Sequence, residues 1–149
     1  MKKLFITIAA AVLCTLAAFA QNEKADNIVG NYICGSGKDA YKVEITKQAD
    51  GNGYKCQIFW VADPLDENGK PSLDTKNPDK SLRSVPMDRV VLFKDLKYNA
   101  EKQHWTDTKI YDPNRGIKVK VTLNFDDSKT LKVRGTVLGI GETVTWKRI

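Results

Sequence analysis

The chain is poor in the residues that enzymes most often use for metal binding and acid–base chemistry. It has one histidine, His104, and three cysteines among 149 residues. A single imidazole offers little for a zinc site built from several histidines or for a Ser-His-Asp arrangement. Gly-x-Ser-x-Gly, phosphate-loop and dinucleotide-binding motifs are absent as well. We therefore expect neither a metal nor a cofactor, and the sequence favours a protein that is not an enzyme.

Long runs of like charge are also missing. Lysine and arginine total 24 against 18 acidic residues, which gives a net charge of +6, and two of these lysines, Lys2 and Lys3, precede an N-terminal apolar run. The remaining +4 is spread over segments in which charged and apolar residues alternate. Such a distribution is typical of a solvated surface and predicts no nucleic-acid partner.

Only one long apolar run is present, and it lies at the N-terminus. Residues 4–19 are apolar, two lysines precede them, and the run ends in Ala-Phe-Ala at residues 18–20. This is the three-part pattern of a cleavable signal peptide, and the run is slightly short of the ~20 residues of a membrane-spanning helix. We predict a signal peptide over residues 1–20 and a periplasmic or secreted protein with no transmembrane segment after cleavage.

Two cysteines, Cys34 and Cys56, remain after the predicted cleavage. An oxidising compartment permits a disulfide between them. If they lie on the first and third strands of a meander, however, about 9 to 10 Å separates them, which exceeds the ~7 Å limit on the Cα separation of a bridge. A disulfide and two buried free thiols both remain open.

Beyond a polar lead-in at residues 21–27, the chain repeats short segments in which apolar and polar residues alternate, separated by turns rich in Gly, Asp, Asn or Lys. This period of two predicts half-buried antiparallel strands, and no segment after residue 20 shows helical periodicity. We predict about eight strands, at 28–34, 41–48, 53–61, 87–93, 105–111, 117–125, 130–138 and 142–149, with 95–99 as a possible ninth. Residues 28–149 should form one all-β, up-and-down β-barrel, because closure leaves no exposed edge, with a sandwich as the alternative.

One connection, residues 62–86, is much longer than the others and contains four prolines. Connections of this length in small domains are usually functional or disordered. This segment is therefore a candidate lid over one end of the barrel.

The second half of the chain carries a set of spaced motifs. These are Asp74, Asn77-Pro78-Asp79, Leu82-Arg83-Ser84, Pro86, Trp105, Ile110-Tyr111-Asp112-Pro113, Gly116, the segment 131–135 and Trp146-Lys147-Arg148. Together they resemble the DUF2147 family, a group of uncharacterised exported bacterial proteins. The resemblance implies a lipocalin-like antiparallel barrel, in agreement with the strand pattern, and implies no reaction.

Barrels of the lipocalin type suggest a structural role for residues on the first and last strands. Tyr32 follows Gly30 in a Gly-x-Tyr, and Arg148 shares a strand face with Trp146. In a closed barrel these strands meet, so Arg148 is expected to cover the Tyr32 ring and seal one barrel end, a cation–π contact worth ~0.5 to 2 kcal/mol.

Other aromatic and aliphatic residues are candidates for lining a cavity. Tyr54, Ile58 and Trp60 are predicted to share one face of the third strand. An eight-stranded barrel is either filled by such side chains or shares its interior with one small ligand. Both interpretations remain open.

The polar residues of the long connection suggest two roles. Arg83 is expected either to pair with Asp79 or Asp112, which would pin the connection to the barrel, or to meet an anionic group of a ligand near Tyr111. The candidate ligand-binding residues are therefore Tyr54, Ile58, Trp60, Arg83, Tyr111 and Asp112.

Three functions follow from these observations. The first is the binding of a small apolar or amphipathic ligand inside the barrel. The second is an envelope-associated protein-interaction module with a filled barrel. The third is a hydrolase that uses the acids of the connection, for which Asp79 and Asp112 are the candidates.

Overall fold

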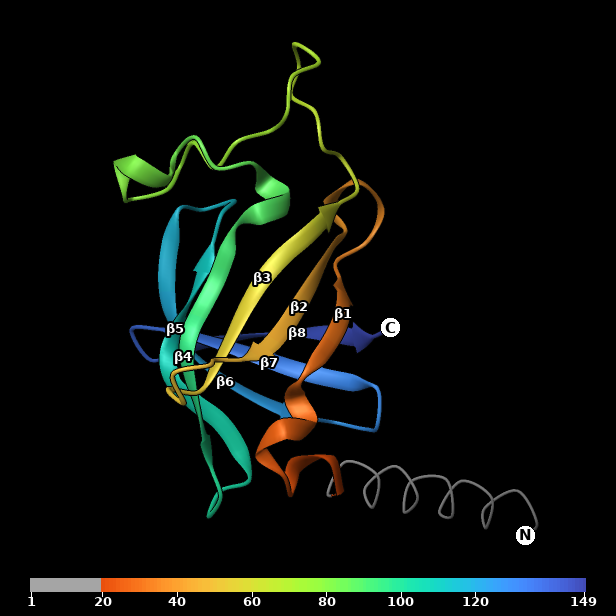
Figure 1. The fold of residues 1–149 in the computed structure, drawn as a ribbon, viewed down its shortest axis with the longest axis vertical. Coiled ribbons are helices and arrows are strands. Elements are labelled where there is room, and N and C mark those ends of the chain that lie inside the picture. Colours follow the sequence, from red (N-terminus) through yellow and green to blue (C-terminus); the bar gives the residue numbers. More distant parts are fainter. Residues whose placement is uncertain (1–19) are drawn as a thin grey trace, which may run out of the picture.

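The described part of the chain is a closed β-barrel. The computed structural model describes residues 20–149, so the predicted signal peptide lies, except for Ala20, outside the described residues. Eight antiparallel strands pair in sequence order, and the last pairs with the first (Figure 1). The predicted up-and-down barrel is thereby confirmed. Within residues 20–149, no helix has the length and apolar character needed to cross a membrane.

The strands follow the predicted alternation closely. They are β1 (Gly30–Cys34), β2 (Tyr41–Lys47), β3 (Tyr54–Val61), β4 (Val91–Asn99), β5 (His104–Asp112), β6 (Ile117–Phe125), β7 (Thr130–Val137) and β8 (Ile140–Arg148). In β6, for example, Val121, Leu123 and Phe125 are buried, whereas Lys118 and Lys120 are exposed. Successive side chains of a strand point to opposite faces, so one face of the barrel wall is apolar and the other is solvated.

Most strand bounds differ from the predicted ones by one or two residues, and two regions differ in a way that changes the structure. The segments 87–93 and 95–99 are not two strands: residues Met87–Arg89 form a short 3-10 helix, η4, and a single strand β4 runs on through Asp95. Asp95 has a φ of 58° and lies where the pairing of β4 with β3 shifts register. This irregularity breaks the alternation, which is why the sequence suggested a break.

The second difference concerns the last turn. The sequence suggests a turn at residues 139–141, but Val137 pairs with Ile140 and the turn consists of Leu138 and Gly139. Both turn residues have positive φ, at 49° and 82°. Positive φ at both central residues is the type I′ geometry, which matches the twist of a two-residue hairpin.

The predicted loose lead-in is instead packed against the barrel. The amide side chain of Asn22 donates to the backbone oxygen of Phe125 (3.0 Å) and accepts from its N–H (2.7 Å). The indole of Trp105 donates to the backbone oxygen of Ala25 (2.9 Å), and the Tyr54 hydroxyl donates to Asp26 (2.5 Å). Residues 22–28, which include the 3-10 helix η1 (Ala25–Ile28), therefore form an end plug (Figure 1).

The barrel is filled at this plugged end. Tyr32, Trp105 and Phe125 are each at most 1% exposed. The Trp105 ring centroid lies 5.9 Å from that of Phe125 and 5.1 Å from that of Tyr98. Large aromatic side chains fill the interior of a barrel of this size, so no space for a ligand is expected here.

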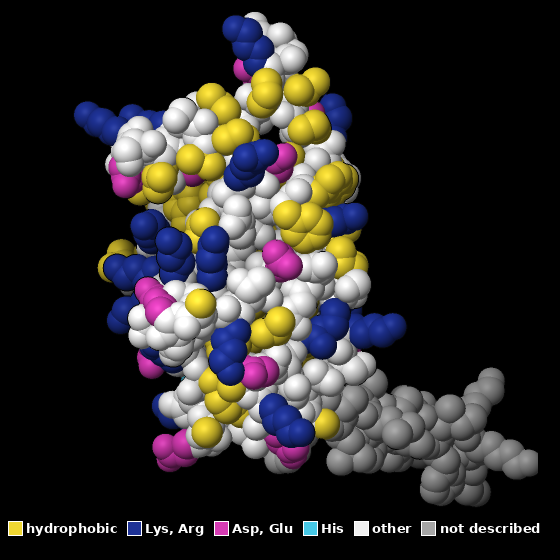
Figure 2. Space-filling view, in the orientation of Figure 1, with side chains coloured by type: hydrophobic (Ala, Val, Ile, Leu, Met, Phe, Trp, Pro, Cys, Tyr) yellow, Lys and Arg dark blue, Asp and Glu magenta, His cyan; other side chains and the backbone are white. Residues whose placement is uncertain are grey.

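The long connection joins β3 to β4 at the opposite end. It contains the 3-10 helices η3 (Lys80–Leu82) and η4, and isolated bridges join Leu65 to Pro71 and Leu73 to Pro86. A further short helix, η2 (Gly37–Asp39), lies in the β1–β2 connection. Figure 1 shows the long connection extending above the barrel, and Figure 2 shows hydrophobic side chains gathered over it.

Candidate functional site: a cavity in the open end of the barrel

The end of the barrel opposite the plug contains a cavity of about 820 Å³. It opens between the four connections that lie at this end, which join β1 to β2, β3 to β4, β5 to β6 and β7 to β8. Ligand sites for small molecules usually measure ~300 to 1,000 Å³. The cavity is therefore large enough for one small molecule.

The cavity walls are mainly aliphatic. The wall residues are Ile58, Val61, Leu92, Ile110, Val119, Val133, Val144 and Trp146. Gly135 also faces the cavity, and a Cβ built there would lie 2.9 Å from the side chain of Val119. Tyr41 and Tyr111 also line the cavity, but most of its lining is aliphatic, and the side chains at this end leave the interior open.

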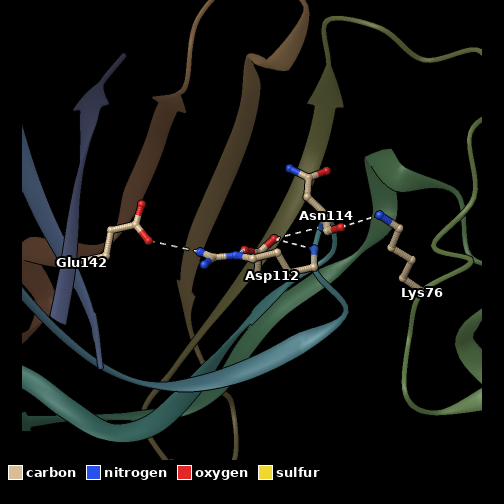
Figure 3. Close-up of polar contacts among 5 residues, drawn as sticks. Lys76, Asp112, Asn114 and Glu142 are labelled. Atoms are coloured by element: carbon tan, nitrogen blue, oxygen red, sulfur yellow. Dashed lines mark hydrogen bonds and ion pairs between the residues drawn. The ribbon is translucent and has the colours of Figure 1, made fainter. Parts of the chain in front are cut away.

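Charged side chains surround the mouth. Arg115, in the β5–β6 turn, donates through Nε to Asp112 (2.6 Å) and through Nη2 to Glu142 on β8 (3.3 Å) (Figure 3). The hydrogen bond to Asp112 and the charges of both acids raise the pKa of Arg115. All three residues line the cavity, as do Lys38 and Asp39. The site thus combines an apolar interior with a charged rim.

The long connection is held to the barrel by a buried acid, Asp74, which is 2% exposed. The hydroxyl of Tyr111 donates to Asp74 Oδ1 (2.6 Å), and the amide of Asn77 donates to Oδ2 (2.7 Å). Burial and the hydrogen bond to Asp74 raise the pKa of Tyr111. Asp74 and Asn77 belong to the motifs noted above, but the sequence did not single out Asp74 as an anchor because its partner on the barrel, Tyr111, lies on a distant strand.

A second contact joins the same connection to the β5–β6 turn. Lys76 donates through Nζ to the backbone oxygen of Asn114 (2.7 Å; Figure 3). The backbone of Lys76 also lies against Gly116, where a Cβ would come within 2.4 Å of the Lys76 oxygen. Only glycine fits this close approach, and its φ of 67° favours glycine as well.

The predicted pairing of Arg83 with an acid is wrong. Arg83 is exposed, and its Nε donates to the backbone oxygen of Asn77 (2.7 Å). Among the described residues, no ion pair joins Arg83 to Asp79 or Asp112. Asp79 instead accepts from the N–H and hydroxyl of Ser81 at the start of η3. Asp79 and Asp112 each have hydrogen-bond partners in their own turns. Arg83 donates instead to a backbone carbonyl.

Of the three residues predicted to share a face of β3, Tyr54 and Ile58 do so, and Trp60 does not. Ile58 is buried and lines the cavity, while Tyr54 is buried at the plugged end. Trp60 is 40% exposed, and the Lys42 ammonium lies 4.8 Å from its ring centroid. The pairing of β2 with β3 shifts register beside Ile58, and this irregularity turns Trp60 to the outer surface.

The structure shows the predicted contact between Tyr32 and Arg148. The guanidinium of Arg148 lies 5.4 Å from the Tyr32 ring centroid and 5.0 Å from that of Phe125. Its Nη2 also donates to the Tyr32 hydroxyl (2.8 Å) and to the backbone oxygen of Asn27. Trp146 is buried and lines the cavity, and its ring centroid lies 6.5 Å from that of Tyr32. Arg148 thus seals the plugged end.

Cys34 and Cys56 are both free and buried. They lie on β1 and β3, and β2 separates these strands, as expected for an unbridged pair. Burial raises the pKa of both thiols. Among the described residues, no group of three or more His, Cys, Asp or Glu side chains is placed to hold a metal ion.

Comparisons with known proteins agree with this geometry. A solved structure of protein HP1028 from Helicobacter pylori, described as belonging to the lipocalin family, matches with a TM-score of 0.64. The two are 22% identical, and the match covers 82% of each chain, which establishes similarity of fold alone. No curated protein was found to match. The profile of DUF2147, described as an uncharacterized protein conserved in bacteria, matches residues 30–148, and the chain therefore belongs to the DUF2147 family.

Proposed function

We propose that this protein binds one small apolar or amphipathic molecule in the open end of its barrel. The observation that carries the proposal is the cavity of about 820 Å³ with aliphatic walls. Burial of a ligand's apolar surface against such walls is favourable, and the charged rim offers polar contacts to a head group outside. The open interior favours this function over an interaction module with a filled barrel.

The geometry gives less support to hydrolysis. Asp112 is engaged by Arg115, and Asp79 by Ser81 in a separate turn. A general acid and a general base must both reach one substrate bond. These two acids are held by different partners, so we do not assign them a joint catalytic role.

A pair of tryptophan substitutions on β8 tests ligand binding. Val144 lines the cavity and is 46% exposed, so Val144→Trp would occupy ligand space without overfilling the core. Its neighbour Thr145 is exposed and outside the cavity lining, so Thr145→Trp serves as the control. We expect Val144→Trp to weaken binding of anilinonaphthalene sulfonate at least tenfold, measured by fluorescence titration, while the control binds normally. Equal binding by both variants would contradict the proposal.

Native mass spectrometry addresses the natural ligand. Protein purified from its own cells should retain a small molecule, and the Val144→Trp variant should carry less of it. A copurifying protein with no small molecule in repeated preparations would instead favour the interaction module.

We also propose that the protein is exported to the periplasm or beyond. The support is the lysine-preceded apolar run and the Ala-Phe-Ala at residues 18–20. N-terminal sequencing of the protein recovered from cells should begin at Gln21. Recovery of a chain that still begins at Met1 would refute cleavage.

A further inference from the structure

The tip of the β7–β8 hairpin, residues 137–140, exposes apolar side chains. Leu138 is 98% exposed, Ile140 80% and Val137 47%. Leu138 also has a positive φ, in a turn type that usually carries Asn or Asp at this position. Neither burial nor backbone preference within the barrel accounts for a leucine here, so the tip is suited to contact something outside the molecule.

Three lysines flank this tip. Lys109 on β5 pairs directly with Lys120 on β6, and Lys118 is two residues from Lys120 on the same strand. All three are exposed, and a shallow hollow of about 360 Å³ is lined by these lysines together with Val137 and Leu138. Figure 2 shows Lys and Arg side chains gathered on the flank where Figure 1 places the β7–β8 turn. We call Lys109, Lys118 and Lys120 the lysine cluster.

Within residues 20–149, the positive charge of the lysine cluster is not neutralised by nearby acidic side chains. Like charges directly opposite on paired strands repel each other. Among the described residues, none of the three forms an ion pair. The pKa of Asp79 is lowered mainly by hydrogen bonds from Ser81, and the charge of Lys118 adds to this from a distance. The cluster is therefore free to meet negative charge from outside.

We propose that the hairpin tip docks the barrel on an anionic lipid surface. Leu138 and Ile140 would enter the boundary between head groups and acyl chains, and the lysine cluster would contact the head groups. Apolar side chains that protrude from a protein can insert into the interface of a bilayer. Each lysine near an anionic surface adds about fivefold in affinity. Val137, Leu138 and Ile140 also line the cavity mouth, so docking brings the mouth to the lipid.

Vesicle binding tests the proposal on the chain that begins at Gln21. This chain keeps the end plug and all eight strands, which close into a barrel between Gly30 and Arg148, and it lacks the apolar leader, which would itself bind lipid. Cosedimentation with phosphatidylcholine vesicles is compared with and without phosphatidylglycerol. We expect binding that requires phosphatidylglycerol and weakens as salt is raised.

Two variants separate the apolar tip from the charge. Leu138→Asn keeps the net charge and suits the positive φ, so it should remain folded and weaken vesicle binding at least tenfold. Lys109→Glu with Lys120→Glu should weaken binding more than twentyfold. Lys102→Glu with Lys129→Glu, in turns at the plugged end, changes the net charge equally and should have a much smaller effect.

Three outcomes would overturn the proposal. These are no binding to phosphatidylglycerol vesicles, unchanged binding by Leu138→Asn, and equal losses for the two lysine pairs. Dimerisation in solution that Leu138→Asn abolishes, seen by analytical ultracentrifugation, would assign the tip to a second copy of the chain and overturn it as well. The docking does not rest on ligand binding, because Lys109→Glu with Lys120→Glu, at positions outside the cavity lining, should still bind anilinonaphthalene sulfonate, and Val144→Trp should still bind vesicles.

Discussion

At the scale of single residues, the hydroxyl of Tyr111 joins β5 to the long β3–β4 connection through Asp74. The acid is 2% exposed, and its other oxygen is occupied by Asn77. If a buried acceptor loses its hydrogen-bond donor, the free-energy cost of removing that acceptor from water is no longer offset. Arg83, for which anchoring was one of two expected roles, is exposed and donates only to the backbone oxygen of Asn77 within the same connection.

We therefore expect Tyr111→Phe to lower the free energy of unfolding by about 1 to 3 kcal/mol. Arg83→Ala is the matched comparison in the same connection and should cost about 1 kcal/mol or less, because water can replace an exposed donor. Urea titration of the unliganded protein measures both. A larger loss for Arg83→Ala than for Tyr111→Phe would show that the anchor is assigned to the wrong residue.

At the scale of elements, the first and last strands close the barrel over the end plug. Arg148 on β8 covers Tyr32 on β1 and donates to the backbone of Asn27 in the plug. Trp146, two residues earlier on β8, lines the cavity. One strand thus seals the filled end and lines the open one, because alternate residues of β8 face the interior all along the barrel axis.

Arg148→Ala should lower the free energy of unfolding by about 2 to 4 kcal/mol, since it removes cation–π contacts and charged hydrogen bonds together. Arg148→Lys keeps a positive charge but not the planar donor geometry, so about half of the loss should remain. Thermal and urea unfolding measure both variants. If Arg148→Ala unfolds like the unmodified protein, Arg148 does not seal the barrel.

At the scale of the whole molecule, alkaline pH should destabilise the barrel. Burial raises the pKa of Tyr41 and Tyr111 above the ordinary 10.0, and of Cys34 and Cys56 above 9.0. From about pH 9 the unfolded chain therefore loses protons that the folded chain keeps, and the free energy of unfolding falls as the pH rises. These groups contribute their full stabilisation below about pH 9.

Urea titrations between about pH 7 and pH 11 should thus show stability that declines above about pH 9, by ~1.4 kcal/mol per pH unit for each proton that differs between the two states. Tyr41→Phe removes one of these groups and should reduce the slope above about pH 10. A stability that stays constant up to about pH 11 would show that these groups titrate normally in the folded protein.

Much of the fold followed from local pattern alone. Strand β6 was predicted with its observed bounds, because residues 117–125 alternate strictly between apolar and polar residues. The contact of Arg148 with Tyr32 was also predicted, since closure of an up-and-down barrel necessarily brings the first and last strands together. These features depend on residue type and chain order, which the sequence contains.

The candidate site was predicted less well. Trp60 was placed inside the barrel by alternation, but a register shift beside Ile58 moves it to the surface. The anchor escaped prediction because Tyr111 and Asp74 lie 37 residues apart. No local spacing relates residues at that separation, so only the folded arrangement brings them together.

The sequence by itself therefore determined the all-β class and the order of the strands, because alternation with a period of two is a local feature of each strand segment. Only the tertiary structure decided that one end is filled and the other open. That outcome depends on which side chains from different strands meet at one level of the barrel: Trp105 and Phe125 meet at the plugged end, whereas Val119, Val133 and Gly135 face the cavity. The volume left inside the barrel depends on the summed volumes of these side chains and not on any one segment.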